Sequence, residues 1–241
     1  MADVLARFRL DGRTAIVTGV GPGIGEHVAK AFAAVGANVV CAARTQERID
    51  RVAAEIEADG GRAISVQTDV SVADDLVRLV DRAHDAFGPV DVLFNNAHAG
   101  VVPIDSDPWS VPDEAWEKAV AVNLLAPYRL AQMVIKDMKA TGKGSIINLL
   151  TCAAFTPTDP QFAYGSTKAG LHMLTRYMAK VAGPDVRVNA ICPGSTSPDG
   201  SMRPNFAEHV PKNAISRTGR AEEAVGAALL LASDASTYTT G

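Results

Sequence analysis

The stretch TAIVTGVGPGIG at residues 14–25 is the most informative about the fold. Its first half is a β-branched, apolar run typical of a buried strand, and its second half is rich in glycine. Apolar side chains at three- and four-residue spacing follow, which predicts a helix. A glycine turn between a strand and a helix lets the backbone approach a phosphate at the helix N-terminus. The stretch therefore predicts a nucleotide-binding turn; the alternative is a tight turn without a ligand.

The rest of the chain repeats the order of a short apolar run followed by an amphipathic stretch. Such alternation predicts a parallel sheet that is covered by helices on both faces. We therefore expect an α/β fold with a single doubly wound parallel sheet (a Rossmann fold), and one domain over residues 1–241. Five further apolar runs are expected to be strands: 38–43, 63–70, 90–96, 144–150 and 186–194.

The end of the sequence departs from this pattern. A helix is expected at 221–233, and the chain then runs through DASTYTTG (234–241) and stops. One more edge strand would be expected after that helix. The sequence shown is therefore expected to lack the last edge strand; a domain that ends on a helix and a turn is the alternative.

Composition limits the classes of function. The chain has a formal net charge of −4 and 47% apolar residues, with no basic stripe for nucleic acid or a membrane surface, so a small-molecule partner is expected. Cys41, Cys152 and Cys192 are odd in number and lack metal-site spacing, which indicates reduced thiols. Because no apolar run is long enough to span a membrane and the N-terminus has no secretory signal, we expect a cytoplasmic protein.

The end of the second predicted strand bears on the cofactor. In this fold an acidic residue normally binds the adenosine ribose there, but the sequence has Ala43 in that place and Arg44 next to it. A missing carboxylate beside a guanidinium favours NADP over NAD; the alternative is a solvated arginine. Asp69, after the third strand, is placed to cap the next helix or to meet an adenine amino group. Ser71 and Asp74 are placed for a capping box.

Tyr164 and Lys168 lie four residues apart in FAYGSTKAG (162–170), so they would project from one face of a predicted helix. An adjacent cation would lower the pKa of the phenol towards the range in which acid/base catalysis is efficient. A lone pair of this kind is more often ordinary helix decoration, so its meaning depends on the rest of the chain.

Seven motifs, in order, resemble the classical short-chain dehydrogenases/reductases from about residue 8 to the end of the chain. They are TGVGPGIG (18–25), DV (69–70), NNA (95–97), Asn123, SIINLLT (145–151), YGSTK (164–168) and RVNAICPG (187–194). The resemblance implies hydride transfer between a nicotinamide cofactor and a secondary alcohol or ketone. The family includes hydroxysteroid, 3-oxoacyl, sugar and xenobiotic ketone reducers, so the implied substrate is a small carbonyl compound or alcohol.

The resemblance also implies roles for four catalytic residues. Tyr164 matches the general acid/base, and Lys168 matches the residue that binds the nicotinamide ribose and lowers the pKa of the tyrosine. Asn123 matches the asparagine that holds a relay water, and Thr151 stands in the place of the family serine. Together with the glycine turn and Arg44, the expected cofactor contacts are Gly19, Gly23, Ile24, Gly25, Arg44, Asp69, Val70, Asn96, Ala97, Tyr164, Lys168, Pro193, Gly194 and Thr196.

Three positions depart from the family pattern. Thr151 keeps a hydroxyl that can bond the substrate oxygen. His98 replaces a glycine and would narrow the space beside the nicotinamide or point outward. Pro198 replaces a threonine that bonds the carboxamide, where Thr196 or Ser197 would substitute. If these departures abolish turnover, the protein would be a nucleotide-binding sensor or scaffold.

The family also implies an assembly. The predicted helix at 163–181 has more apolar surface than one sheet can cover, which indicates a helix–helix contact between subunits. By resemblance we expect a homotetramer, or a dimer, through this helix and the one at 221–233.

Overall fold

The computed structural model describes residues 3–101, 107–157, 161–201 and 214–241. Its centre is a six-stranded sheet with the order β3-β2-β1-β4-β5-β6, and every neighbouring pair is parallel. The predicted doubly wound parallel sheet is therefore confirmed. The strands are β1 (Thr14–Thr18), β2 (Asn38–Ala43), β3 (Arg62–Gln67), β4 (Val90–Asn95), β5 (Gly144–Leu149) and β6 (Val186–Ile191); a separate pair consists of β7 (Thr196–Ser197) and β8 (Gly219–Arg220).

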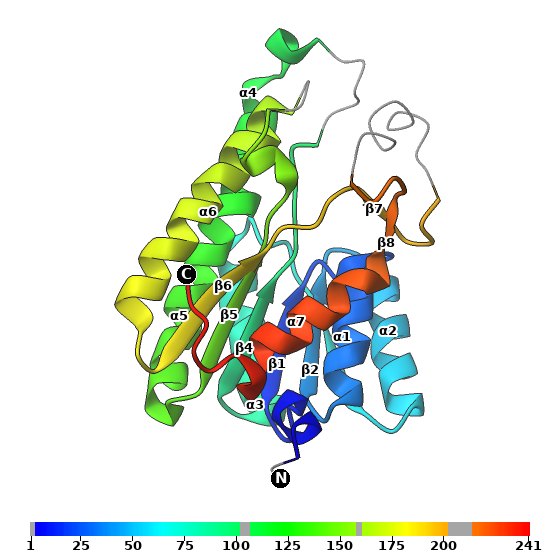
Figure 1. Ribbon diagram of the computed structural model, residues 1–241, viewed down its shortest axis with the longest axis vertical. Coiled ribbons are helices and arrows are strands. Elements are labelled where there is room, and N and C mark those ends of the chain that lie inside the picture. Colours follow the sequence, from blue (N-terminus) through cyan, green and yellow to red (C-terminus); the bar gives the residue numbers. More distant parts are fainter. Residues whose placement is uncertain (1–2, 102–106, 158–160, 202–213) are drawn as a thin grey trace.

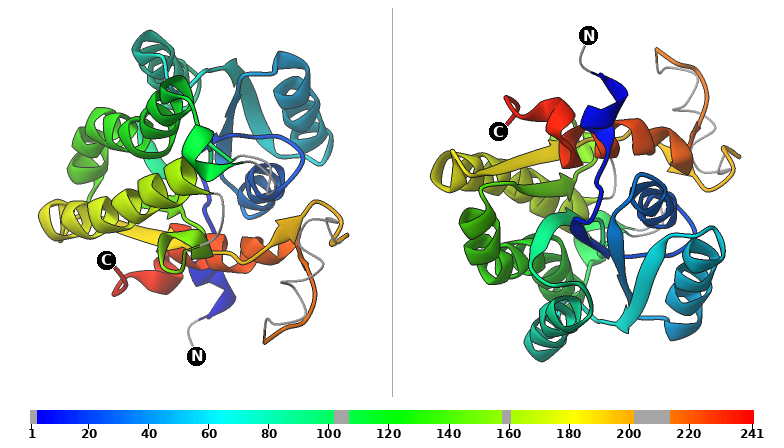
Figure 2. Two further views of the ribbon diagram at one scale, coloured as in Figure 1. Left: turned by 90° about the horizontal axis from the view of Figure 1, so that it is seen from above. Right: turned by 90° about the horizontal axis from the view of Figure 1, so that it is seen from below.

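Helices cover both faces of the large sheet (Figures 1 and 2). One face carries α1 (Ile24–Ala34), α2 (Gln46–Ala58) and α7 (Val225–Ala232), and the other carries α3 (Ala73–Phe87), α5 (Ala126–Thr141) and α6 (Phe162–Ala182). Helix α4 (Asp113–Val120) continues into a π-helix (Ala121–Leu125) before α5. Short 3₁₀ turns occupy Leu5–Phe8, Pro108–Ser110, Cys152–Ala154, Ala221–Ala224 and Asp234–Ser236.

Two hydrophobic clusters, one on each face, form the core. Successive strand residues point to opposite faces, so Ala15 and Val17 enter one cluster while Ile16 enters the other. On β2, Cys41 packs in the first of these clusters and Val40 packs in the second. This two-sided burial is the reason why the strands are apolar throughout rather than alternating. No helix in the described parts of the chain is long and apolar enough to cross a membrane.

The chain end lies beside β6. The N–H of Val188 donates to Thr240 Oγ1 at 3.0 Å, and the N–H of Gly241 donates to the Val188 carbonyl at 2.9 Å. The Asn189 amide donates to the Thr239 carbonyl at 2.8 Å. No strand is formed in 234–241, and β6 is the last strand of the sheet in the described chain, as the sequence predicted.

Candidate active site

The glycine turn joins β1 to α1 at the end of the sheet where the parallel strands finish. Gly19 has a φ of +69°, and a Cβ there would lie 2.8 Å from the backbone of Ala97. A Cβ on Gly25 would lie 2.5 Å from the Gly19 carbonyl oxygen. These two glycines are therefore required by the close approach of the turn to the end of β4, whatever the turn binds.

Gly23 has a different role from its neighbours. Its φ of +139° requires glycine, yet a Cβ there would meet no described atom within 4 Å. Gly23 is also the N-cap of α1, and no side chain caps that helix. The first-turn N–H groups of α1, which begin at Ile24, therefore have no capping side chain, and a bound pyrophosphate would supply their acceptor. The residues present fit the phosphates of a dinucleotide.

Asn96 fastens this turn to β4. Its Nδ2 donates to the carbonyl oxygens of Thr18 at 3.0 Å and Gly19 at 2.8 Å. In return, the Thr18 hydroxyl accepts from the N–H groups of Asn96 at 3.1 Å and Ala97 at 3.3 Å. The buried Asn96 amide is thus used to hold the turn, and the sequence alone, which marked it as a cofactor contact, did not show this second role.

Two arginines lie near the turn without a partner. Arg44 follows β2 directly and is exposed, and its carbonyl accepts from Gln67 Nε2 at 3.0 Å. Arg48 lies four residues later, with its Cδ 4.0 Å from the place of a Cβ on Gly21. Within the described chain, no hydrogen bond or ion pair occupies either guanidinium. Arg48 was missed from the sequence, although its four-residue spacing from Arg44 was a usable signal.

Asp69 forms a turn of its own. Its Oδ1 accepts from the Ser71 N–H at 3.0 Å and the Ser71 hydroxyl at 2.6 Å, while its N–H donates to Asp75 Oδ2 at 2.8 Å. The predicted capping box of Ser71 with Asp74 is therefore wrong, because the Ser71 hydroxyl donates to Asp69 instead. The predicted helix cap by Asp69 is also wrong, because the N-cap residue of α3 is Val72 and no side chain caps the helix. Burial opposes the charge of Asp69, but the Ser71 hydrogen bonds and nearby cations hold its pKa below the ordinary value. The next residue, Val70, is buried.

The end of β5 and the first turns of α6 bring three candidate catalytic residues together. Thr151 comes two residues after β5, and its hydroxyl lies close enough to the Tyr164 phenol to favour the ionised form of the phenol. The Lys168 ammonium lies 6.0 Å from the centroid of the Tyr164 ring and donates to the Leu149 carbonyl at 2.6 Å. Only 1% of Lys168 is exposed. The predicted side-by-side placement of Tyr164 and Lys168 therefore holds.

Burial governs the protonation of this group. Burial lowers the pKa of Lys168 to about 8, because no carboxylate within 4 Å in the described chain compensates its charge. Burial also raises the pKa of Tyr164, and the nearby Thr151 hydroxyl opposes that rise only in part; the thiols of Cys152 and Cys192 add to the rise. The predicted lowering of the Tyr164 pKa by Lys168 is therefore wrong for this structure, since the desolvation of the phenol outweighs the effect of its neighbours.

Asn123 lies in the π-helix and is fully buried. Its Oδ1 accepts from the Ala99 N–H at 2.9 Å, and its Nδ2 donates to the Ala99 carbonyl at 2.8 Å and to the Thr167 hydroxyl at 2.9 Å. Both amide hydrogens are thus used within the protein, and the side chain ties the segment after β4 to α6. Single π-turns inside helices often mark functional sites, and here the turn directs this asparagine inward.

The segment after β6 carries the remaining predicted contacts. A Cβ on Gly194, which follows Pro193, would meet no described atom within 4 Å, so space for a ligand lies beside it. Ser197 is buried and its hydroxyl donates to the Ser201 carbonyl at 2.9 Å, which leaves Thr196 as the better substitute for the family threonine. The rest of this segment, residues 202–213, lies outside the described residues.

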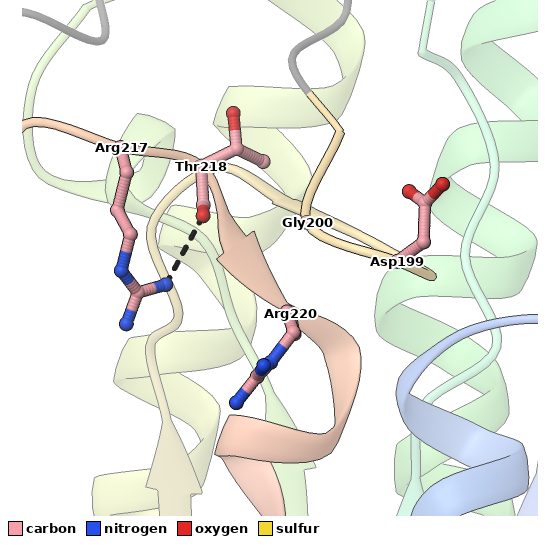
Figure 3. Close-up of a pocket in the computed structure, with 5 residues that line it drawn as sticks. All are labelled: Asp199, Gly200, Arg217, Thr218 and Arg220. Atoms are coloured by element: carbon pink, nitrogen blue, oxygen red, sulfur yellow. Dashed lines mark hydrogen bonds between the residues drawn. The ribbon is translucent and has the colours of Figure 1, made fainter.

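A cavity of about 350 Å³ lies beside the β7–β8 pair (Figure 3). It is lined by Asp199, Gly200, Arg217, Thr218 and Arg220. Arg217 pairs with Glu223 at 2.6 Å and Arg220 pairs with Glu222 at 2.9 Å, so the arginine charges are neutralised. The buried Thr218 hydroxyl has no hydrogen-bond partner among the described residues. The cavity does not include Thr151, Tyr164 or Lys168.

Comparison with known proteins agrees with this geometry. A family profile described as "short chain dehydrogenase" matches residues 13–208. The 7alpha-hydroxysteroid dehydrogenase of Escherichia coli (strain K12) is 33% identical over 242 residues, which cover 97% of this chain and 92% of that protein.

Two solved structures are also similar. A 7 alpha-hydroxysteroid dehydrogenase complexed with NADH and 7-oxo glycochenodeoxycholic acid has a TM-score of 0.91 at 32% identity and covers 98% of this chain and 93% of its own. The NADPH-dependent 3-quinuclidinone reductase of Rhodotorula rubra has a TM-score of 0.91 at 32% identity. That similarity covers 100% of this chain and 91% of the reductase. One complex contains NADH and the other enzyme depends on NADPH, so similarity of this degree is compatible with either cofactor.

Proposed function

Because the chain belongs to the short-chain dehydrogenase family, we propose that it is an NADP-preferring oxidoreductase that transfers a hydride between the nicotinamide and a secondary alcohol or ketone. The observation that carries this proposal is the group of Thr151, Tyr164 and Lys168 at the end of β5. A phenol that lies beside a hydroxyl and a buried amine is suited to proton exchange with a substrate oxygen.

The proton steps are assigned to the residues of this group, while the bound cofactor supplies or accepts the hydride. In reduction, the Tyr164 hydroxyl gives its proton to the carbonyl oxygen; in oxidation, the tyrosinate takes the proton of the alcohol. Thr151 donates a hydrogen bond that orients the same substrate oxygen. Lys168, with a pKa of about 8, reaches both charge states near neutral pH and restores the proton on Tyr164.

Arg44 and Arg48 support the preference for NADP. Both side chains are exposed, and no hydrogen bond or ion pair holds either guanidinium in the described chain. Arg44 directly follows β2, and Arg48 lies beside Gly21 of the turn that would bind the pyrophosphate. The acidic residue that would bind the ribose hydroxyls of NAD is replaced by Ala43. A 2′-phosphate would find two guanidinium donors at this place.

The test is to titrate the protein with NADPH and NADH by cofactor fluorescence, and then to add a panel of ketones, quinones and 3-oxoacyl thioesters. We expect tighter binding of NADPH, and oxidation of it by at least one compound class. Tyr164→Phe should bind NADPH with unchanged affinity and lose turnover by about 10²–10⁴-fold. Tight binding without turnover on any compound would instead favour the nucleotide-binding sensor.

We further propose that this domain (residues 1–241) assembles as a homotetramer, or a dimer, in the cytoplasm. Helix α6 exposes 46% of Met173, 65% of Tyr177 and 71% of Val181, and α7 exposes 40% of Leu230, which is apolar surface suited to subunit contacts. The free thiols suit a reducing compartment. Light scattering coupled to size-exclusion chromatography tests the assembly, and Tyr177→Glu should dissociate it.

A further inference from the structure

His98 stands where the family motif has glycine, and it contacts the proposed acid/base directly. The ring centroids of His98 and Tyr164 lie 6.2 Å apart with an interplanar angle of 65°. His98 is exposed and Tyr164 is half-buried, so the imidazole lies on the solvent side of the site. Edge-to-face pairs at this separation are mutually favourable.

The backbone around His98 is held from two sides. The next residue, Ala99, is clamped through both its N–H and its carbonyl by the fully buried Asn123. Gly100 has a φ of +83°, and a Cβ there would lie 2.7 Å from the Ala119 Cβ and 3.8 Å from the Tyr164 nitrogen. The segment after β4 is therefore seated against α4, the π-helix and the first turn of α6. Its position fixes where the His98 ring can lie.

We propose that His98 is a positioning and specificity residue for Tyr164, an inference that rests on the proposed function. The imidazole packs against the phenol ring, so the proton donor keeps one orientation towards the substrate oxygen. The same ring fills space beside the phenol that a glycine would leave open. The site therefore disfavours ketones with bulk on that side of the carbonyl.

The first experiment compares His98→Ala, His98→Phe and wild type in steady-state kinetics. We expect His98→Ala to lower kcat about 3–10-fold with unchanged NADPH affinity, and to lower KM for bulky ketones relative to small ones. His98→Phe should recover most of the lost kcat, because the aromatic contact remains. The matched control is His172→Ala. His172 lies on α6 and makes a similar ring contact with Phe155, with the ring centroids 4.8 Å apart.

Two kinetic results would overturn the proposal. Unchanged kcat in His98→Ala would show that the ring contact does not position Tyr164. A His98→Phe variant as slow as His98→Ala would show that the aromatic contact is not what matters.

A second measurement does not depend on turnover, so it separates this proposal from the proposed function. His98→Ala, Tyr164→Ala and the double variant are compared by thermal unfolding. If the rings support each other, His98→Ala lowers Tm by about 2–4 °C more in wild type than in the Tyr164→Ala background. Additive Tm changes would contradict the contact even if the enzyme reduces ketones.

Discussion

Charged side chains are held differently at the α1–α2 surface and beside Tyr164. On α1 and α2, Glu26 pairs with Arg51 at 2.6 Å and Lys30 at 2.8 Å, and Glu55 pairs with the same two cations at 2.8 and 2.6 Å. Burial works against the charge of Glu26, yet these partners lower its pKa to about 2. Lys168 is more deeply buried, its one hydrogen-bond acceptor among the described residues is the Leu149 carbonyl oxygen, and its pKa falls to about 8.

The difference separates charges that have ion-pair partners from a buried cation that has none among the described residues. The α1–α2 network favours the charged forms of its members, so it supports the packing of two helices. Lys168 is destabilised as a cation by its surroundings, and strongly shifted pKa values of this kind cluster at functional sites. The comparison makes opposite predictions for removing a charge at the two places.

The largest expected effect is that of Lys168→Met. Turnover should fall by about 10²–10⁴-fold, because the amine beside Tyr164 is lost. The free energy of unfolding at pH 7 should nevertheless rise, by up to about 3 kcal/mol, since the folded protein no longer holds a buried ammonium. Lys30→Met, which removes a paired cation, is the matched control and should lower stability. Chemical denaturation measures the free energy of unfolding of both variants. A Lys168→Met variant less stable than wild type would contradict the proposed cost of the buried ammonium.

The lowered pKa of Lys168 also predicts how the stability of the protein depends on pH. The unfolded chain keeps the Lys168 proton up to the ordinary pKa of 10.5, whereas the folded chain releases it near pH 8. The unfolded state therefore binds more protons between these values, and the stability of wild type should rise with pH there relative to Lys168→Met. Urea titrations at a series of pH values measure the difference. A difference that stays constant from pH 7 to 10.5 would contradict the lowered pKa.

Arg44 and Arg48 extend the comparison to cations that are unpartnered but exposed. Water solvates them, so they cost the fold little and remain free for a ligand. Arg44→Ala and Arg48→Ala should each weaken NADPH binding about tenfold and leave NADH binding unchanged. Arg78→Ala, at an arginine paired with Asp75, is the control. Equal losses for both cofactors would place these arginines away from a 2′-phosphate.

The smallest effect is expected from Glu26→Gln. Removing the shared carboxylate should lower the free energy of unfolding by about 1–2 kcal/mol at neutral pH. The contribution of Glu26 is fully present above the ordinary pKa of 4.5 and is lost as the pH falls through about 2. Acid denaturation curves should therefore converge with wild type at low pH. Glu47→Gln, at an exposed carboxylate on α2, should leave them unchanged.

The sequence predicted the features that depend on local pattern. Apolar runs alternating with helices led to the six-stranded sheet, and four-residue spacing led to Tyr164 beside Lys168. The roles of Asn96 and Asn123 depend on contacts with Gly19 and Ala99, which are 77 and 24 residues away, and no spacing rule reports such pairs.

The direction of the Tyr164 pKa shift also could not be predicted from the spacing of residues. The spacing of Tyr164 and Lys168 indicated a lowered phenol pKa, but the direction depends on how deeply the phenol is buried. The helix cap expected from Asp69 failed for a similar reason. Which partner takes the Ser71 hydroxyl depends on the turn that the backbone makes after β3.

The most direct test of the unpaired buried cation is to measure the pKa of Lys168 by carbon NMR of the lysine ε-carbons, with the signal assigned by its absence in Lys168→Met. We expect one lysine signal with a titration midpoint near pH 8. If the Lys168 signal instead titrates near 10.5 with the exposed lysines, the cation is not destabilised by its site, and the contrast with the α1–α2 network is contradicted.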